Sequence, residues 1–333
     1  MRLGVLGTGM IARLIVPHLE EWGCTVGAVC STPRSVQAAR ELAGTVAAAE
    51  VHTDLAAMLA QTDIDTVYLA VPNHLHHGAA IRALEAGKHV IVEKPIASTV
   101  EEARDLAATA RERGLMLAEA ITTLHQPNYA KLREFLPRIG DIKIVSCNFS
   151  QYSSRYDAFR AGTVLPAFDP AKSGGALMDL GVYNMHWLIG LFGEPVRAAY
   201  HANIERGIDT SGVMELDYGS FKAVSVAAKD CAAPSRSTIQ GTRGYLALAT
   251  PPSSCGGLTL HLNDGTEERV DLNPENQWES AFRSISAMID AGDRERCEAL
   301  LRHSVAVSHT MTEARRAAGI WFAADAPYRG ARA

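Results

Sequence analysis

The sequence lacks the features that mark several classes of protein. Its six cysteines include no C-x-x-C pair, which in a chain of 333 residues indicates reduced, mostly buried thiols rather than a disulfide framework. No Lys/Arg-rich run is present and the formal net charge is −5, so neither nucleic acid nor an anionic membrane is an expected partner. No apolar stretch reaches transmembrane length, and Arg2 leads straight into an apolar run, so we expect no signal peptide. These absences permit a soluble cytoplasmic enzyme.

The first third of the chain alternates short apolar runs with amphipathic segments. Apolar strands that alternate with helices predict an α/β domain with a doubly wound parallel sheet, the Rossmann architecture, whose ligand lies at the carboxyl ends of the strands. Asp54 and the capping box Thr99-x-x-Glu102 are expected to begin two of the helices. We expect strands at 3–6, 25–30, 66–71, 89–92 and 115–118, and helices at 11–22, 35–42, 55–60, 77–86 and 100–113.

The character of the sequence changes after about residue 119, which predicts a nucleotide-binding domain at 1–120 and a substrate-binding domain at 121–333. The second is expected to be α+β, with a large, open, mainly antiparallel sheet. Because an open sheet face needs cover, we expect a homodimer or homotetramer formed through it. Expected helices lie at 129–135, 175–191, 279–291 and 302–321, the last packing back on the first domain. Expected strands lie at 142–151, 198–203, 213–218, 223–227, 237–240, 245–248, 258–262 and 267–272, and 152–173 is polar.

A glycine-rich turn follows the first expected strand. The order Gly7-Thr8-Gly9-Met10-Ile11-Ala12 places glycines where a strand turns into a helix N-terminus, an arrangement that binds phosphate through backbone N–H groups. Gly7 allows the tight turn, Gly9 allows the backbone to approach a pyrophosphate, and the small Ala12 allows close helix–strand packing. The pattern predicts dinucleotide binding, although such turns also occur for structural reasons alone.

The end of the second expected strand bears on which dinucleotide is bound. NAD sites usually carry an acidic residue there, but positions 22–40 contain none. The hydroxyls of Ser31 and Thr32 and the cation of Arg34 suit a 2′-phosphate, which favours NADP over NAD. The alternative is an ordinary turn with a solvated Arg34.

Two further loops follow strands at the same edge. The first, at the end of the expected strand 66–71, reads Ala70-Val71-Pro72-Asn73-His74-Leu75-His76-His77, and we expect its backbone, Asn73 and His76 to contact the cofactor. Three histidines could suggest a metal, but no further ligand cluster accompanies them, so we expect no metal.

The second loop follows the expected strand 89–92 and reads Glu93-Lys94-Pro95. An ammonium at this place can donate a proton or stabilise an alkoxide during hydride transfer. The alternative is a solvated pair of loop residues.

The expected helix at 175–191 carries a third group of polar residues. Asp179, Tyr183 and His186 stand at i, i+4 and i+7, which would place them on one face of a helix. They are either a satisfied core network or the lining of a site. A phenol can pass a substrate proton, and a nearby Lys94 would favour its ionised form. The preceding Gly174-Gly175 pair would allow a ring to approach the helix start.

Together these elements resemble the glucose–fructose oxidoreductase and inositol dehydrogenase family, written Gfo/Idh/MocA, over nearly the whole chain. The resemblance implies a Rossmann domain, a second domain with a large open sheet that forms oligomer interfaces, and NAD(P)-linked oxidation or reduction of sugars, cyclitols or related polyols. The motifs are Gly7-x-Gly9-x-x-Ala12, Val71-Pro-Asn73-x-x-His76, Ala86-Gly-Lys-His-Val-Ile-Val-Glu93-Lys94-Pro95, Glu119-Ala120 and Gly174-Gly175-Ala-x-x-Asp179-x-Gly-x-Tyr183.

The resemblance also implies roles for single residues. Lys94 and Asp179 match catalytic positions of the family. Many members have histidine where this chain has Tyr183, and this departure resembles the glucose–fructose oxidoreductase, xylose dehydrogenase and dimeric dihydrodiol dehydrogenase branch rather than inositol dehydrogenases. In that branch tyrosine is the expected proton donor. Substrate contacts are expected from Glu119, Arg155 and His186, although the segment around Arg155 also reads as an exposed loop.

The leading functional hypothesis is therefore a nicotinamide-dependent dehydrogenase or reductase of a carbohydrate-like substrate. One alternative is a glycosidase of this fold that uses a held nicotinamide for transient oxidation. The other is a non-catalytic regulator that senses the cofactor, against which the joint presence of Lys94, Asp179 and Tyr183 argues.

Overall fold

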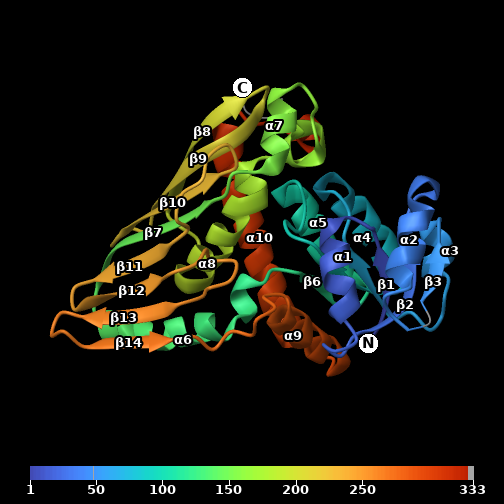
Figure 1. The fold of residues 1–333 in the computed structure, drawn as a ribbon, viewed down its shortest axis with the longest axis horizontal. Helices are drawn as coiled ribbons and strands as arrows, with labels where there is room; N and C mark the ends of the chain where they lie inside the picture. The colour runs from blue at the N-terminus through green and yellow to red at the C-terminus, as the bar shows by residue number, and fades with distance from the viewer. Residues whose placement is uncertain (48, 329–333) are drawn as a thin grey trace. The chain divides into compact units, whose positions relative to one another are not determined.

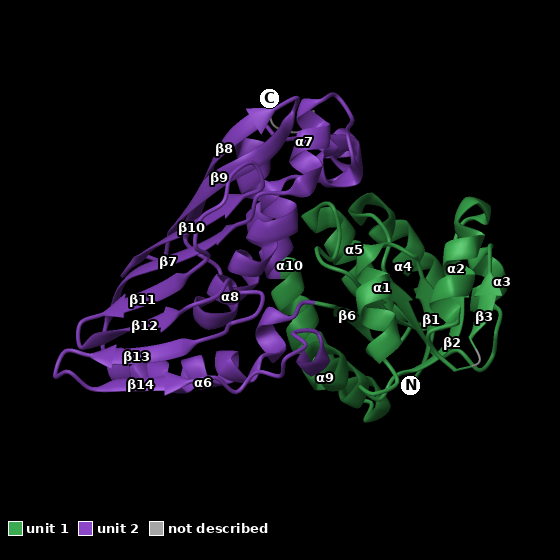
Figure 2. Cartoon of the chain, viewed as in Figure 1, with its two compact units in different colours: residues 1–120, 281–305 green, residues 121–280, 306–333 purple. Residues whose placement is uncertain are grey.

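The structure is a computed structural model that describes residues 1–47 and 49–328 (Figure 1). Its contacts divide the chain into two compact units, drawn in two colours in Figure 2. Unit 1 comprises Met1–Ala120 and Ala281–Val305, and unit 2 comprises Ile121–Ser280 and the chain from Ala306 onward. Across the described residues, no helix combines the length and the apolar composition that a bilayer crossing requires.

Unit 1 contains a six-stranded sheet whose neighbouring strands all pair in parallel. Its order is β3-β2-β1-β4-β5-β6, so the winding direction reverses between β1 and β4. The predicted doubly wound parallel sheet is thus confirmed. The strands are β1 Arg2–Leu6, β2 Thr25–Cys30, β3 Glu50–His52, β4 Thr66–Leu69, β5 His89–Val92 and β6 Leu117–Glu119.

Helices pack against this sheet because its central strands are apolar on both faces. Val67 and Val90 are fully buried and share an apolar core with Ala83 of α4 and Leu106 of α5. Each fully buried side chain of this size contributes about 1.5–3 kcal/mol. The helices of this unit are α1 Met10–Ile15, α2 Val36–Ala43, α3 Leu55–Leu59, α4 His76–Glu85, α5 Val100–Glu112, α9 Glu279–Asp290 and the first part of α10 Arg294–Ala317.

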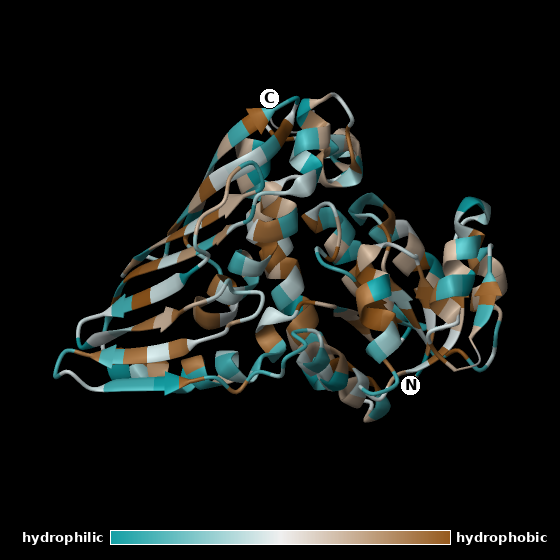
Figure 3. Ribbon diagram, viewed as in Figure 1, coloured by the Kyte–Doolittle hydropathy of each residue, from teal (hydrophilic) through white to brown (hydrophobic). Residues whose placement is uncertain are grey.

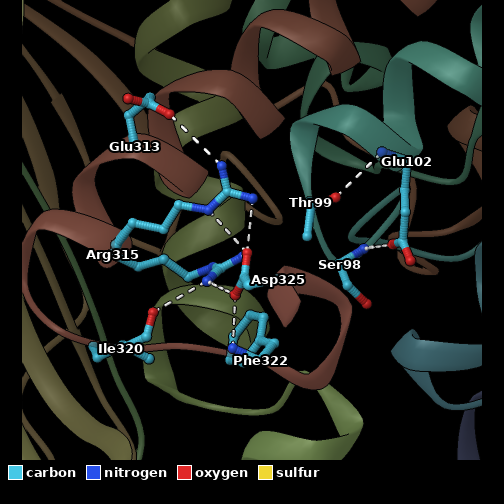
Figure 4. Close-up of polar contacts among 9 residues, drawn as sticks. Ser98, Thr99, Glu102, Glu313, Arg315, Ile320, Phe322 and Asp325 are labelled. Carbon is cyan, nitrogen blue, oxygen red and sulfur yellow. Dashed lines mark hydrogen bonds and ion pairs between the residues drawn. The ribbon is translucent and has the colours of Figure 1, made fainter. Parts of the chain in front are cut away.

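Two predicted helix caps are present. Thr99 Oγ1 accepts a hydrogen bond from the Glu102 N–H at 3.2 Å, and the Glu102 carboxylate accepts one from the Ser98 N–H at 2.9 Å (Figure 4). The Asp54 carboxylate accepts from the Ala56 N–H at 3.1 Å and caps α3. Caps of this kind contribute about 0.5–2 kcal/mol each, and they fix where α3 and α5 begin.

Unit 2 contains an eight-stranded sheet of order β14-β13-β12-β11-β7-β10-β9-β8. The neighbours pair antiparallel except β7 and β10, which run parallel, so the predicted mainly antiparallel sheet is confirmed. The strands are β7 Ile142–Ser150, β8 Arg197–Glu205, β9 Ile208–Asp217, β10 Lys222–Ala228, β11 Ser237–Gly241, β12 Gly244–Leu248, β13 Leu258–Leu262 and β14 Glu267–Val270.

The two faces of this sheet differ within unit 2. Helices α6 (Pro127–Phe135) and α8 (Val182–Phe192) lie on one face, where Val145, Ile239 and Leu246 join their core (Figure 1). The alternation of apolar and polar residues along the strands is visible in Figure 3. The opposite face carries a cross-strand row that includes Ile144 and Tyr245, which are 50% and 42% exposed. None of this unit's described helices covers that row.

The end of α10 is fastened to the residues that follow it. Arg315 and Asp325 form a buried ion pair, with Arg315 Nη2 donating to Asp325 Oδ1 at 3.0 Å (Figure 4). The Phe322 N–H donates to the other carboxylate oxygen at 2.7 Å. Asp325 also pairs with Arg316 at 2.8 Å, so loss of Asp325 would leave the buried Arg315 charge without its carboxylate partner.

Several elements differ from the expectation. β3 has a single apolar residue, Val51, and gave no strand signal. The polar stretch contains a helix, α7 Ser154–Arg160, which buries Phe159. Helix α10 begins at Arg294 instead of 302. Its first turns are mainly charged and exposed, with Cys297 buried among them, so the apolar pattern did not predict them.

Candidate active site

Unit 1 gathers the predicted cofactor residues at the carboxyl edge of its sheet, at the ends of β1, β2, β4 and β5. Gly7 has φ +115°, and a Cβ atom there would lie 2.2 Å from Ala70 O, so only glycine allows β1 and β4 to end this closely. Gly9 precedes α1, and a Cβ atom there would meet nothing within 4 Å. Helix α1 has no side-chain cap and no acidic residue in its first turn, so Thr8, Gly9, Met10 and Ile11 fit a dinucleotide phosphate.

The loop after β2 keeps its hydroxyls at the same edge. Ser31 is nearly buried, and its Oγ donates to Thr32 O at 3.1 Å. Thr32 precedes a short 3₁₀ turn, Pro33–Ser35, on which Arg34 is exposed. No acidic residue stands in this loop, so its charge fits a 2′-phosphate.

The loop after β4 is tied to the loop after β5 by His76. The His76 ring is fully buried, with Nδ1 2.8 Å from Pro95 O and Nε2 2.9 Å from Val71 O. Burial lowers the pKa of His76. His76 therefore braces Ala70, Val71, Pro72 and Asn73 against the Lys94 turn, a bracing role that sequence reasoning did not anticipate. His77 turns elsewhere, with Nε2 2.7 Å from Asp105 Oδ2.

Lys94 stands out within its turn because its neighbours are buried. From Ile91 to Val100 every residue except Lys94 is buried. The turn is held at Pro95 by His76 and at Ile96, whose N–H donates to Glu119 Oε1 at 2.8 Å. Glu119 is 6% exposed and ends β6, so in this structure it fastens the Lys94 turn. The turn thus leaves one partly exposed lysine at the ligand-binding edge.

Glu93, beside Lys94, is a buried carboxyl group. Tyr68 of β4 donates its phenol O–H to Glu93 Oε1 at 2.7 Å. Burial raises the pKa of Glu93 to about 7. The pKa of this carboxyl group therefore lies near neutral pH, and the group immediately precedes Lys94 in the turn.

In unit 2, the helix with the polar group opens as a π-helix over Leu177–Gly181 and continues as α8. Its start is fixed by Asp209 of β9, which accepts from the Leu177 N–H and from the Tyr200 O–H, both at 2.7 Å. Burial raises the pKa of Asp209 to about 6. A Cβ atom on Gly175 would lie 2.0 Å from Asp209 Oδ1. In this structure the group that approaches Gly175 closely is therefore the Asp209 carboxylate of the protein itself. A π-helical turn of this kind often marks a functional site.

Asp179 lies within this π-helical turn and is paired with Lys229. Lys229 Nζ lies 2.7 Å from Asp179 Oδ2, and the exposed fractions of the two side chains are 2% and 34%. The same ammonium donates to Ala167 O at 3.0 Å. Sequence reasoning missed Lys229, although its place directly after an apolar strand parallels that of Lys94.

The other predicted residues of unit 2 differ in exposure. Tyr183 is partly buried, with its ring 5.8 Å from that of Phe149. His186 has no exposed surface, so it has no part in the proposed chemistry. Arg155 lies on α7 and is partly buried. Throughout the described ranges, no three His, Cys, Asp or Glu residues are grouped as a metal site.

Two family models match the chain. The first, described as "Oxidoreductase family, NAD-binding Rossmann fold", matches residues 1–121, and the second, "GFO/IDH/MocA C-terminal domain", matches residues 129–247. The chain belongs to the Gfo/Idh/MocA family. It is an oxidoreductase whose cofactor is NAD(P), and the family predicted from the motifs is confirmed.

Named relatives extend over most of the chain. Scyllo-inositol 2-dehydrogenase (NADP(+)) from Bacillus subtilis is 35% identical, over 98% of this chain and 99% of its own length. A dTDP-3,4-didehydro-2,6-dideoxy-alpha-D-glucose 3-reductase from Streptomyces violaceoruber is 33% identical, over 81% and 80%. A solved 3-ketoreductase from Actinomadura kijaniata, in complex with NADP and TDP-benzene, has a TM-score of 0.81 at 27% identity, over 95% and 97%. An inositol dehydrogenase thus stands among the relatives, although Tyr183 had favoured another branch.

Proposed function

We propose that this protein is an NADP-dependent dehydrogenase or reductase acting on a hydroxyl or carbonyl group of a sugar, cyclitol or related polyol. The observation that carries the proposal is the Lys94 turn, where one lysine remains accessible at the ligand-binding edge while every neighbour from Ile91 to Val100 is buried. The substrate classes named for the relatives, a cyclitol and a keto-sugar nucleotide, support the chemical class.

The proposed cofactor residues form the edge described above. The backbone of Gly7–Ile11 would hold the pyrophosphate, the residues Ser31, Thr32 and Arg34 would hold the 2′-phosphate, and the loop from Ala70 to Asn73 with Glu93 would lie along the nicotinamide half. Support for NADP over NAD comes from the missing acidic residue after β2 and from the NADP named for two relatives.

The bound nicotinamide would supply the hydride chemistry, and the chain would supply the proton and the charge. We assign proton exchange with the substrate hydroxyl to the Tyr183 phenol. The Lys94 ammonium binds the substrate oxygen and stabilises developing negative charge there. Asp179 binds a second substrate hydroxyl. The solved structures of the Actinomadura ketoreductase include one variant with a lysine replaced and one with a tyrosine replaced. The two residues that we assign to proton and charge in this chain are likewise a lysine and a tyrosine.

The proposal is tested by a screen of aldoses, cyclitols, keto-sugars and diols with NADP(H) and NAD(H), read by nicotinamide absorbance. We expect turnover of at least one polyol or keto-sugar, with kcat/KM for NADP exceeding that for NAD by about tenfold or more, as expected for an Arg-containing 2′-phosphate site. Tight cofactor binding without turnover of any compound would contradict the proposal and favour a regulator. Glycoside cleavage without net cofactor reduction would favour the glycosidase alternative.

The assembly and location of the protein belong to the same proposal. We infer a homodimer or homotetramer formed through the uncovered face of the unit 2 sheet, supported by the exposed apolar side chains of Ile144 and Tyr245. A cytoplasmic location is supported by the six cysteines, all of which are free thiols.

A further inference from the structure

We propose that Lys229 is a positioning residue for the reaction, holding the Asp179 carboxylate in its charged state and in one orientation. The inference rests on the proposed function, in which Asp179 belongs to the catalytic group. No motif discussed above includes Lys229, and the family resemblance assigned it no role.

The surroundings of Lys229 show that its ammonium is built into the fold. The side chain is 2% exposed, and its Nζ contacts Asp179 Oδ2, Ala167 O and the face of the Phe168 ring, whose centroid lies 4.6 Å away. Its backbone is fixed as well, because the Lys229 N–H donates to Thr210 O and Lys229 O accepts from the Ser153 N–H, both at 2.9 Å. A buried ammonium is costly unless it is paired and hydrogen-bonded, and these contacts meet that requirement.

The two members of the pair differ in access. Lys229 is almost wholly enclosed, whereas about a third of the Asp179 side chain is exposed, at 34%. Lys229 therefore has no surface with which to bind a substrate, and it can act on the reaction only through its neighbours. Asp179 sits in a π-helical turn, whose backbone is less regular than that of an α-helix. The ion pair with Lys229, which directly follows β10, limits the Asp179 carboxylate to one position.

Two other carboxylates stand close to Lys229 in the fold or in the sequence, Asp209 and Asp230. Asp209 is close enough for the Lys229 charge to act on it, but its carboxylate is already engaged by Leu177 and Tyr200. Asp230 accepts from the hydroxyls of Thr210 and Ser211 at 2.7 and 2.8 Å. Of these three carboxylates, Asp179 is the one in direct contact with Lys229 Nζ.

The test compares Lys229→Met with Asp179→Asn and with the double variant, using a substrate from the screen. We expect Lys229→Met to lower kcat by about 10- to 100-fold, as loss of a positioned charge does, while NADPH affinity stays within about threefold. The acid limb of the kcat/KM profile should move to higher pH, because Asp179 loses the cation that favours its ionised form. Lys222→Met, at the exposed start of β10, is the matched control and should leave kcat unchanged.

The double variant separates positioning from a general structural role. If Lys229 acts through Asp179, adding Lys229→Met to Asp179→Asn should change kcat by less than about twofold. The inference would be overturned if the double variant lost kcat by the product of the two single losses. It would also be overturned if the acid limb of the kcat/KM profile did not move in Lys229→Met. Should Lys229→Met fail to fold, Lys229→Gln keeps a donor for Ala167 O without the charge, and the same expectations apply to it. An unchanged kcat in Asp179→Asn would instead contradict the catalytic role in the proposed function.

Discussion

The two glycines of the turn after β1 differ in their surroundings. Gly7 is required by the fold, because its φ is positive and Ala70 O occupies the space of a side chain. Gly9 has an extended backbone and open space around it, so the fold does not require glycine at this position. In the proposed function, glycine is needed there because the cofactor pyrophosphate approaches the backbone.

Replacing each glycine by alanine should therefore give opposite results. We expect Gly7→Ala to lower the free energy of unfolding by about 2 kcal/mol or more, because positive φ and the contact with Ala70 O both oppose a Cβ atom. We expect Gly9→Ala to change stability by less than about 1 kcal/mol yet weaken NADPH binding by about tenfold or more. Chemical denaturation and fluorescence titration measure the two effects. A stable Gly7→Ala, or full NADPH affinity in Gly9→Ala, would contradict this assignment.

Glu93 predicts a dependence of stability on pH. Burial raises its pKa from the ordinary value of 4.5 to about 7, so the folded state holds a proton that the unfolded state has released. The contribution of Glu93 to the free energy of unfolding is therefore fully present at low pH, and it is lost as the pH rises through about 7. In the cofactor-free protein, the stability of Glu93→Gln relative to wild type should rise between pH 5 and 8 by up to about 3 kcal/mol.

Tyr68→Phe provides the companion measurement for Glu93. Removing the phenol that donates to the carboxylate should raise the pKa of Glu93 further, so the loss of stability moves to higher pH than in wild type. Denaturant titrations at several pH values measure both variants. A difference between Glu93→Gln and wild type that does not vary with pH would contradict a buried, protonated Glu93.

At this scale, sequence reasoning found the residues that stand at strand ends or in short motifs. The position of Lys94 follows from a rule about parallel sheets, which needs only the strand and its end. Lys229 and Asp209 could not be found in this way, because their partners Asp179 and Leu177 lie 50 and 32 residues away in the sequence. Only folding of unit 2 brings these residues into contact.

Among the elements, the strands with periodic apolar residues were predicted well. β2, β5 and β13 match the expected ranges in full, because each is bounded by polar or turn residues. The π-helical turn at Leu177–Gly181 was not expected, since its composition is that of an ordinary helix. The first residue of this turn is held from outside the segment, because the Leu177 N–H donates to Asp209 of β9.

The π-helical turn should depend on Asp209. We expect Asp209→Ala to lower the free energy of unfolding by about 2–4 kcal/mol, because it leaves the Leu177 N–H and the Tyr200 O–H buried without their acceptor. Turnover should fall as well, since Asp179 lies in that turn. Asp217→Ala, on the same strand but in a partly exposed ion pair, should cost less than about 1 kcal/mol. Equal losses in the two variants would show that Asp209 does not anchor the turn.

For the whole molecule, the uncovered sheet face of unit 2 predicts self-association. Val224→Lys places a charge in the middle of that face, on β10 beside Ser146 and Glu215. We expect wild type to sediment as a dimer or tetramer, and Val224→Lys to weaken association by about 100-fold or more, as a buried unpaired charge does. Leu14→Lys, on an exposed position of α1 in unit 1, is the control and should keep the wild-type assembly. A monomeric wild type would contradict the prediction.

The central claim concerns Lys94, the partly exposed lysine among buried neighbours that carries the proposed function. The most direct test is Lys94→Met, with the exposed Lys143→Met as control. Single-turnover kinetics should show hydride transfer slowed by about 10³-fold, while NADPH affinity, measured by fluorescence, stays within about threefold of wild type. A Lys94→Met variant that transfers hydride at the wild-type rate would contradict the account.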